Sequence, residues 1–272
     1  MDKEVLDRLH KTLVEILLEV DRVCRLHGIT YFAVGGTLLG AVVHKDFIPW
    51  DDDLDIAMPR RDYDRFLSLA ETELGEKYYL HHTSTDDDYW LPFAKVKKKG
   101  TVFIEKGREN IKNFPEIYID IFPFEATQKK NGLTAKLKFS VIRSLDAVIR
   151  KRVTKTGFNH AYGYFFSFFF APIRTKISAN FRYSLMKSFC GNHPRYYMDI
   201  AGGRSLKNSY FIMDKITPVC ELSFGDIAIP APNDPNYYLL ELYGERYKII
   251  PPPEERWTHE PLAVSFGDEC CK

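Results

Sequence analysis

Closely spaced aspartates follow a glycine pair near the start of the chain. Residues 50–56, WDDDLDI, place Asp53 and Asp55 two positions apart, so on a strand both side chains lie on one face, which Asp51 joins if the strand extends that far. Neighbouring carboxylates repel one another and stay ionised together only beside a cation. Because no Lys or Arg lies between Phe47 and Pro59, we expect a divalent ion with oxygen ligands, Mg²⁺ or Mn²⁺.

A further acid, Asp120, lies among apolar residues in residues 118–122, YIDIF. This segment is predicted to be an interior strand, where a lone acid is costly without a partner. We therefore predict Asp120 as the third carboxylate at the metal and as the candidate general base. The alternative is that residues 51–55 only cap a helix or shape a loop.

The glycine pair is followed by a hydroxyl residue, in the sequence Gly35-Gly36-Thr37. Glycines let backbone N–H groups approach an anion closely, and the start of a helix favours negative charge. The lysine of a GxxxxGK[ST] loop is absent, so this is not a Walker loop. A Gly-Gly-Thr turn, a DxD strand and a lone-Asp strand together predict a phosphate cradle that faces a metal site.

The elements that must position these residues follow from hydrophobic spacing and from breakers. Apolar residues recur at helical spacing from Leu6 to Cys24, and Gly28 ends this helix. Further helices are predicted at 37–43, 60–74 and 237–243, and much of 129–195 is compatible with helix. Strands are predicted at 30–34, 53–58, 78–82, 93–96, 101–105, 118–122 and 227–230, and an extended tail at 251–253.

Residues 31–66, YFAVGGTLLGAVVHKDFIPWDDDLDIAMPRRDYDRF, closely resemble the signature of the LicD family, which includes the fukutin-related proteins. The resemblance continues through residues 91–96 (LPFAKV) and 118–123, and returns at 243–244 and 252–259. It implies an α+β fold with a nucleotidyltransferase-like mixed sheet flanked by helices. We expect residues 1–128 to form the catalytic core, 129–195 a basic helical insertion, and 196–272 a C-terminal part that completes the catalytic body.

The resemblance also implies an activity. Such enzymes transfer a phospho-alcohol, most often phosphocholine from CDP-choline, to a sugar hydroxyl of a cell-surface glycan or its lipid-linked precursor, and release CMP. Matched by position, Gly35, Gly36 and Thr37 are implied to bind phosphate, and Asp53, Asp55 and Asp120 to bind the metal and act in catalysis. Two positions depart from the family pattern. Val43 stands where arginine is common, which leaves the donor's pose and identity open, and Asp46 stands where glycine is common.

Several other residues are candidates for substrate contacts. His44, Lys45 and Lys95 are possible phosphate or leaving-group contacts, although each is equally compatible with a surface cation or a hydrogen-bonded core histidine. A choline head group binds over aromatic faces, for which Trp50 and Trp90 are the candidates. His259 is placed either at the site or on the surface.

The net charge of +1 over 272 residues hides an imbalance. Residues 129–187 hold thirteen Lys and Arg but one acid, a charge of +12, while the other 25 basic and 36 acidic residues sum to −11. Such asymmetry predicts a basic contact surface, or else a solvated basic helix. Within this part, residues 156–173 carry no charged side chain and are rich in Phe and Tyr, including Phe165–Phe170.

That composition favours a segment lying on the inner face of the cell membrane, with basic flanks on anionic head groups. An internal or oligomer-interface helix and a true membrane span are the alternatives. Five scattered cysteines and the absence of a secretory signal favour a cytoplasmic protein, peripheral at the membrane. We expect no nucleic-acid partner.

Three further functions stay open at this stage. The donor could carry glycerol or ribitol phosphate instead of phosphocholine. A DxD glycosyltransferase also uses carboxylates on a nucleotide diphosphate, although it has no need of the Gly-Gly-Thr turn. A membrane-bound adaptor that kept the fold without turnover is the non-enzymatic alternative.

Overall fold

The computed structural model describes residues 1–107, 115–128, 132–154 and 175–267. Its α-helices are α1 (Lys3–His27), α2 (Gly35–Val43), α3 (Arg60–Glu73), α4 (Leu133–Thr154), α6 (Thr175–Lys187) and α7 (Pro235–Tyr243). Its strands are β1 (Phe32–Ala33), β2 (Asp55–Pro59), β3 (Tyr78–His81), β4 (Ala94–Lys98), β5 (Val102–Ile104), β6 (Tyr118–Thr127), β7 (Tyr196–Asp199), β8 (Tyr210–Ile212), β9 (Cys220–Phe224), β10 (Ile227–Ala231) and β11 (Ala263–Ser265). Short 3₁₀ turns are η1 (Leu206–Asn208), η2 (Met213–Lys215), η3 (Glu245–Lys248) and η4 (Pro253–Glu255).

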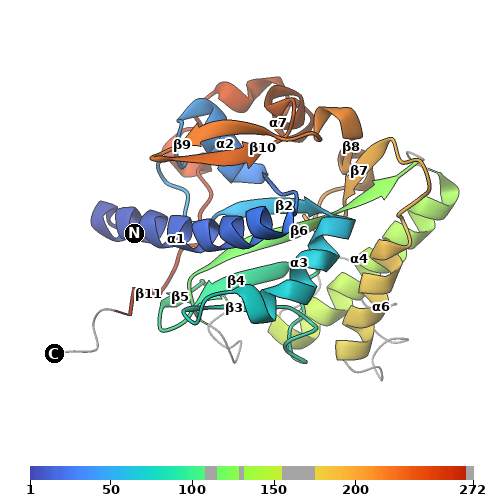
Figure 1. Cartoon of the computed structure of the whole chain (residues 1–272), viewed down its shortest axis with the longest axis horizontal. Helices are drawn as coiled ribbons and strands as arrows, with labels where there is room; N and C mark the ends of the chain where they lie inside the picture. Colours follow the sequence, from blue (N-terminus) through green and yellow to red (C-terminus); the bar gives the residue numbers. More distant parts are fainter. Residues whose placement is uncertain (108–114, 129–131, 155–174, 268–272) are drawn as a thin grey trace.

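A mixed sheet forms the centre of the molecule (Figure 1). Its strands run in the order β1-β2-β6-β4-β3; β2 and β6 are parallel, and the other neighbours are antiparallel. The second half of β6 continues the sheet by pairing with β7, which pairs with β8. The predicted α+β class is confirmed.

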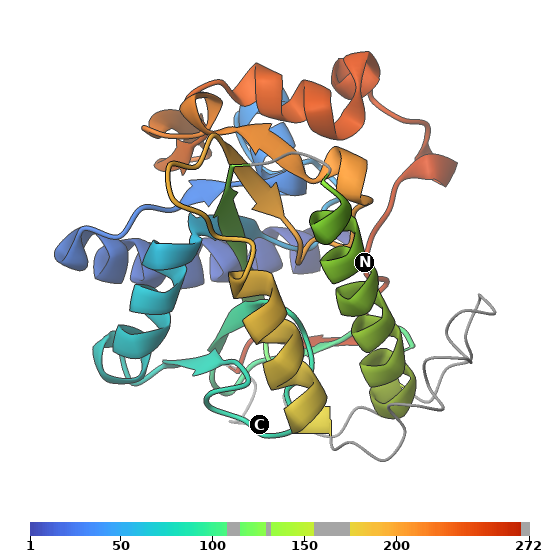
Figure 2. The same cartoon turned by 90° about the vertical axis from the view of Figure 1, so that its right-hand side faces the viewer.

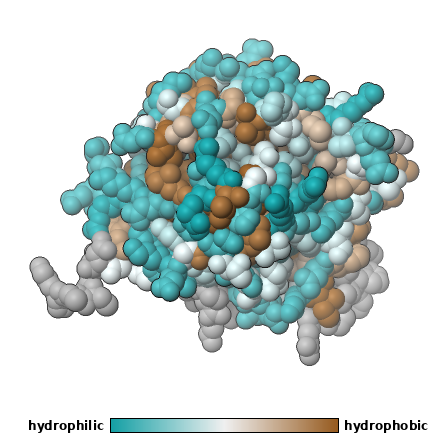
Figure 3. Space-filling model, in the orientation of Figure 1, coloured by the Kyte–Doolittle hydropathy of each residue, from teal (hydrophilic) through white to brown (hydrophobic). Residues whose placement is uncertain are grey.

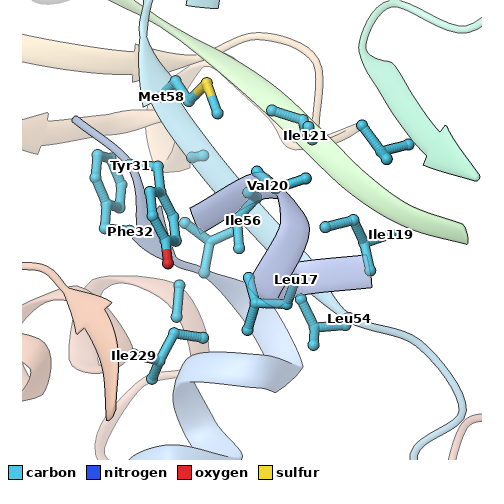
Figure 4. Close-up of a cluster of buried hydrophobic side chains, with 14 of the residues drawn as sticks. Leu17, Val20, Tyr31, Phe32, Leu54, Ile56, Met58, Ile119, Ile121 and Ile229 are labelled. Carbon is cyan, nitrogen blue, oxygen red and sulfur yellow. The ribbon is translucent and has the colours of Figure 1, made fainter. Parts of the chain in front are cut away.

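Helix α1 covers one face of this sheet because its apolar side chains fall on a single stripe. Asp2 caps its first turn by accepting a hydrogen bond from the backbone N–H of Val5 (2.9 Å), and Gly28 ends it in the left-handed conformation. Leu17 and Val20 of the buried stripe lie with Leu54, Ile56, Ile119 and Ile121 of the sheet side, as Figure 4 shows. Part of the apolar core therefore lies between α1 and this face of the sheet.

The C-terminal part contains strands that the sequence did not reveal. β7, β8, β9 and β11 were not predicted, since each has only three to five residues and no clear alternation. β9 and β10 form a hairpin near α2 and α7 (Figure 1), and β11 pairs with β5 of the N-terminal half. The tail predicted as extended at 251–253 leads into the 3₁₀ turn η4 before it reaches β11. The chain therefore returns from its C-terminal part to the N-terminal half, where β11 and β5 form a separate two-stranded sheet.

Helices α4 and α6 lie side by side at one end of the sheet, as Figures 1 and 2 show. They pack on β7 and β8 through Ile142 and Met186, which cluster with Met198 and Tyr210. Residues 155–174, including Phe165–Phe170, lie outside the described residues, so the interpretation of this segment stays a prediction. None of the described helices combines the length and the hydrophobicity needed to cross a bilayer. Figure 3 shows one face of the molecule as mostly hydrophilic, with small apolar patches.

Candidate active site

Four side chains of different strands form one row across the central sheet. Asp55 of β2 lies opposite Asp120 of β6, Asp120 lies opposite Lys95 of β4, and Lys95 lies opposite His81 of β3. Residues directly opposite each other on neighbouring strands share a face of the sheet. The row therefore runs from carboxylates at one end to a cation and an imidazole at the other, on one face of the sheet.

Asp51 and Asp53 reach the same region as Asp55 without belonging to its strand. We predicted a strand from residue 53, but β2 begins at Asp55, so strand alternation does not align these acids. A turn of residues 48–51 precedes them, with the Asp51 N–H donating to the Ile48 carbonyl (2.9 Å). All three carboxylates nevertheless face one cavity, and Asp51 and Asp53 share a hydrogen bond.

The glycine pair gives two of these carboxylates the space they occupy. A Cβ atom on Gly36 would lie 2.5 Å from Asp51 Oδ2, and one on Gly35 would lie 3.2 Å from Asp55 Oδ2. Gly35 also has a φ of +56°, which favours glycine. Both glycines line the cavity at the first turn of α2. They thus bring the start of a helix against the acids, and they remain exposed to a ligand in the cavity.

Thr37 connects α2 to β2. Its hydroxyl accepts a hydrogen bond from the backbone N–H of Asp55 (2.8 Å), and its side chain is buried at 2% exposure. The backbone of Val34 donates to the Asp55 carbonyl (3.2 Å), while Asp120 donates to the Leu54 carbonyl (3.0 Å). The hydroxyl that we predicted to bind phosphate is therefore engaged in fixing the start of β2, and a ligand contact by Thr37 stays a prediction.

Burial makes it costly to ionise the carboxylates of the cavity together. Burial, followed by repulsion from Asp53, raises the pKa of Asp51 to about 9. Burial also raises the pKa of Asp53, and it raises that of Asp55 well above its usual range, with repulsion from neighbouring acids added. At neutral pH a cation beside these groups would favour their ionised forms, and their oxygen-only chemistry fits a hard divalent ion.

The carboxylates by themselves do not complete a metal site. Among the side chains that the structure describes, no three His, Cys, Asp or Glu residues are already arranged to hold a metal ion. Mg²⁺ is commonly held by one or two carboxylates together with substrate phosphates and water. Asp53 and Asp55 therefore fit a site that a phosphate-bearing substrate completes.

Asp120 has a cationic partner of its own. Lys95 Nζ lies 2.7 Å from Asp120 Oδ1, and it also lies 3.1 Å from the centre of the Tyr118 ring. Both side chains are largely buried, at 6% exposure for Lys95 and 14% for Asp120. The sequence suggested only a metal as the cation beside Asp120, because a lysine two strands away in sequence order cannot be placed without the register of the sheet.

Asp51, Asp53 and Asp55 lie in the wall of a cavity of about 650 Å³, which Asp120 does not line. Gly35, Gly36, Val43, His44 and Trp50 line it from the N-terminal half. Its other wall comes from residue 204 and from segments within 243–257. The sequence motifs at 243–244 and 252–259 thus lie beside the aspartates. Segments that are distant in the sequence but resemble the same family therefore meet at one cavity.

Of the other residues that we predicted to contact substrate, some line the cavity and others do not. Trp50 carries the guanidinium of Arg256 over its ring (4.1 Å) and lies edge-on to His44. Lys45 and Lys95 do not line the cavity; the Lys45 carbonyl accepts from Gly225 (2.7 Å). Trp90 packs with α4 and α6, and its carbonyl accepts from Arg182 (2.8 Å). Trp90 therefore stands apart from the cavity, whereas Trp50 and His44 belong to it.

His259 forms a pair with the one acid of the cluster that does not line the cavity of Asp53. Its Nδ1 lies 2.9 Å from Asp52 Oδ1, its backbone N–H also donates to that carboxylate, and Nδ1 lies 3.9 Å from Asp53 Oδ2. Burial alone would lower the pKa of His259, but the bond to Asp52 and the charge of Asp53 raise it. Asp52 thus ties the C-terminal segment to the acid-rich loop, a role that nothing in the sequence spacing indicated.

Comparison with known proteins agrees with the motifs. Residues 28–155 match the family described as LicD/FKTN/FKRP, nucleotidyltransferase domain. The chain is 26% identical to the lipopolysaccharide cholinephosphotransferase LicD of Haemophilus influenzae, over 95% of this chain and 97% of the relative. It is 28% identical to the human ribitol 5-phosphate transferase FKRP over 40% of this chain, which is 19% of that relative. An uncharacterized protein of Rickettsia typhi, RT0683, is 38% identical over 26% of this chain and 23% of its own length. The resemblance to the LicD family is confirmed.

Proposed function

We propose, because residues 28–155 match the LicD family, that this phosphotransferase moves a phospho-alcohol from a CDP-linked donor to a sugar hydroxyl of a cell-surface glycan. The proposal takes phosphocholine as the group transferred and CMP as the nucleotide released. Support comes from a cholinephosphotransferase that aligns over nearly the whole chain. A ribitol 5-phosphate transferase aligns over a shorter stretch, so ribitol phosphate is the alternative cargo.

One observation carries the proposal: a helix start and a cluster of buried acids meet in a single cavity. Phosphoryl transfer requires alignment of donor and acceptor and neutralisation of developing negative charge. The first turn of α2 offers the backbone N–H groups of Gly35 and Gly36, which carry no side chains of their own and lie beside the carboxylates of Asp51 and Asp55. This arrangement suits the phosphates of a nucleotide-linked donor, and it supports the nucleotidyltransferase-like fold that we propose.

Asp53 and Asp55 would hold a divalent ion, Mg²⁺ or Mn²⁺. Such an ion, when bound, neutralises phosphate charge and orients the reacting groups. Asp55 is fixed for this by the Thr37 hydroxyl and by its pairing with Val34 and Asp120. Asp120 is the proposed base that takes the proton of the acceptor hydroxyl, and Lys95 at 2.7 Å compensates its charge.

The reaction is tested by release of nucleotide from a set of donors. Purified protein with Mg²⁺ or Mn²⁺ is incubated with CDP-choline, CDP-ribitol, CDP-glycerol or nucleotide sugars and a glycan acceptor, and CMP, UMP and UDP are quantified. We expect CMP from one CDP-alcohol, loss of release with EDTA, and recovery on adding metal. Asp226→Asn, a change at an exposed acid outside the cavity, is the matched control for substitutions of Asp55.

The alternatives give different results in this assay. Release of UDP alone would identify a glycosyltransferase and overturn the proposal. Release of no nucleotide under any condition, with donor binding indifferent to Asp53→Ala, would favour the adaptor without turnover. Release of CMP from CDP-ribitol and not from CDP-choline would support the proposed reaction and identify ribitol phosphate as the group transferred.

We also propose that the chain contacts the inner face of the cell membrane through α4 and α6. Helix α4 ends and α6 begins at the same end of the pair (Figure 2), where Lys151 and Arg152 close α4. Ile177 and Phe181 of α6 are exposed at 56% and 48%. Apolar side chains beside basic ones suit a surface of anionic lipid.

Sedimentation with vesicles tests this contact. We expect binding to vesicles that contain phosphatidylglycerol, little binding to phosphatidylcholine alone, and weakening by salt because the attraction is electrostatic. The double variant Ile177→Ser/Phe181→Ser should bind less, whereas Ile212→Ser, an exposed apolar residue on β8, serves as the matched control. Binding that ignores lipid charge and salt would remove this part of the proposal.

A further inference from the structure

The cavity that holds the aspartates has a second wall that is mostly basic, in which Lys248 and one acid, Glu255, accompany three arginines. Arg204, Arg246 and Arg256 line it together with Asp51, Asp53 and Asp55. The three arginines come from the loop after β7, from η3 and from the segment after η4. They are distant in sequence from the acids, and charge spacing along the chain gave no sign that the two sets share a cavity.

Arg204 is positioned both through its backbone and through its guanidinium. Its carbonyl accepts a hydrogen bond from Arg143 of α4 (2.7 Å). Its Nε lies 3.5 Å from Asp199 Oδ2, so an ion pair also holds the guanidinium. Arg204 is thereby fixed at the edge of the cavity that it lines.

Arg256 is held in place by contacts other than an ion pair with a carboxylate. Its guanidinium lies 4.1 Å above the Trp50 ring, and its Nε donates to the Pro251 carbonyl (3.2 Å). Within the described ranges, neither Arg256 nor Arg246 forms an ion pair with an acid. Planar guanidinium groups fixed by stacking bind phosphate through two parallel hydrogen bonds.

We propose that Arg204, Arg246 and Arg256 form the diphosphate-binding wall of the donor site. This inference rests on the proposed function in taking the donor to be a nucleoside diphosphate-linked alcohol. A diphosphate between the two walls would meet guanidinium groups on one side and, through a divalent ion, the aspartates on the other. Neither wall is enough to bind the diphosphate by itself. The ionised acids repel the anion unless a divalent ion lies beside them, and the arginines cannot take the place of that ion.

The stacking of Arg256 on Trp50 also limits where the alcohol part of the donor can bind. Arg256 occupies the ring face that a quaternary ammonium would use. The wall therefore recognises the phosphates common to CDP-alcohols, and the ammonium of a choline donor must bind away from the Arg256 face of Trp50.

Binding without turnover tests the wall. The affinities of the full chain for Mg²⁺–CDP and for Mg²⁺–pyrophosphate are measured by titration calorimetry in wild type, Arg246→Gln, Arg256→Gln and Arg246→Lys. Each Gln variant should bind both ligands about tenfold or more weakly, since a hydrogen bond to a charged group is lost, and Arg246→Lys should recover part of the affinity. Arg195→Gln, at an exposed arginine outside the cavity, should bind as wild type does.

The outcomes separate this inference from the proposed reaction. If both Gln variants bind CDP and pyrophosphate as wild type does, the arginine wall is overturned even where CMP is released. If wild type releases no CMP from any donor and the Gln variants still lose pyrophosphate binding, the wall stands and the reaction fails. Since both arginines are exposed, unchanged thermal unfolding of the unliganded variants shows that folding is not the cause.

Discussion

Asp55 and Asp120 lie directly opposite each other on the parallel strands β2 and β6. A parallel pair requires a crossover in the chain, and here that crossover contains α3 and the strands β3, β4 and β5. Two acids from separate motifs are therefore brought to adjacent strands by topology. Asp55 and Asp120 are each the subject of a prediction below.

Asp55→Asn should abolish the reaction without unfolding the protein. The amide keeps the shape but removes the charge that would bind a divalent ion, so we expect CMP release to fall by about 100-fold or more. Burial raises the pKa of Asp55, so above its unfolded pKa the ionised acid destabilises the fold, and the amide should raise the melting temperature of the metal-free protein. CMP release and thermal unfolding are measured on the same preparations. A variant that keeps full release would remove Asp55 from the site.

Gly36→Ala should impair the site through a single methyl group. The added Cβ would lie 2.5 Å from Asp51 Oδ2, so the carboxylate must shift away from the helix start. We expect CMP release to fall at least about tenfold, a loss of about 1.4 kcal/mol of transition-state stabilisation. Gly132→Ala is the matched control, because a Cβ there meets nothing within 4 Å. Equal rates for the two variants would contradict the close approach of Asp51.

The sequence was informative where local spacing determines structure. The periodic apolar residues of α1, the Gly28 stop and the start of the strand around Asp120 appear as predicted, whereas the predicted end of that strand at residue 122 is wrong because β6 continues through Pro123 to Thr127. The pairing of Gly35 and Gly36 with the acids was also foreseen, although as a phosphate cradle. The two glycines also leave space for the carboxylates of Asp51 and Asp55. That role depends on distances between side chains, which the spacing of residues in the sequence does not give.

Register and long-range contacts set the limits of prediction. Lys95 meets Asp120 because β4 pairs with β6 in one particular register, and a shift of one residue would place the lysine on the opposite face. Likewise, His259 contacts Asp52, which lies 207 positions earlier in the sequence. Contacts of this kind follow from the packed fold, so the sequence offered Lys95 and His259 as candidates but could not assign their partners Asp120 and Asp52.

Lys95→Met should destabilise the fold by leaving Asp120 without its cation. Removing one partner of a buried ion pair costs about 3–5 kcal/mol, and Lys95 is 6% exposed. The double variant Lys95→Met/Asp120→Asn should regain part of that stability while remaining inactive, because the proposed base is gone. Free energies of unfolding for the two single variants and the double variant complete the cycle. Additive effects would show that the two side chains do not interact.

His82 should make stability fall as the solution becomes acidic. Burial, followed by repulsion from Arg60, lowers the pKa of His82 to about 4 from 6.5. As the pH drops, the unfolded chain binds the proton first, so the contribution of neutral His82 is complete above about pH 6.5 and is lost towards pH 4. The span of the shift corresponds to about 3 kcal/mol.

A neutral isostere isolates this effect from the other titrating groups. His82→Gln cannot take up the proton, so the difference in unfolding free energy between it and wild type should change in favour of the variant between pH 6.5 and pH 4. Chemical denaturation at several pH values in this range measures that difference. His193→Gln, a change at an exposed histidine, should follow the wild-type curve. If the curves of His82→Gln and wild type stay parallel, His82 is not held neutral by its burial beside Arg60.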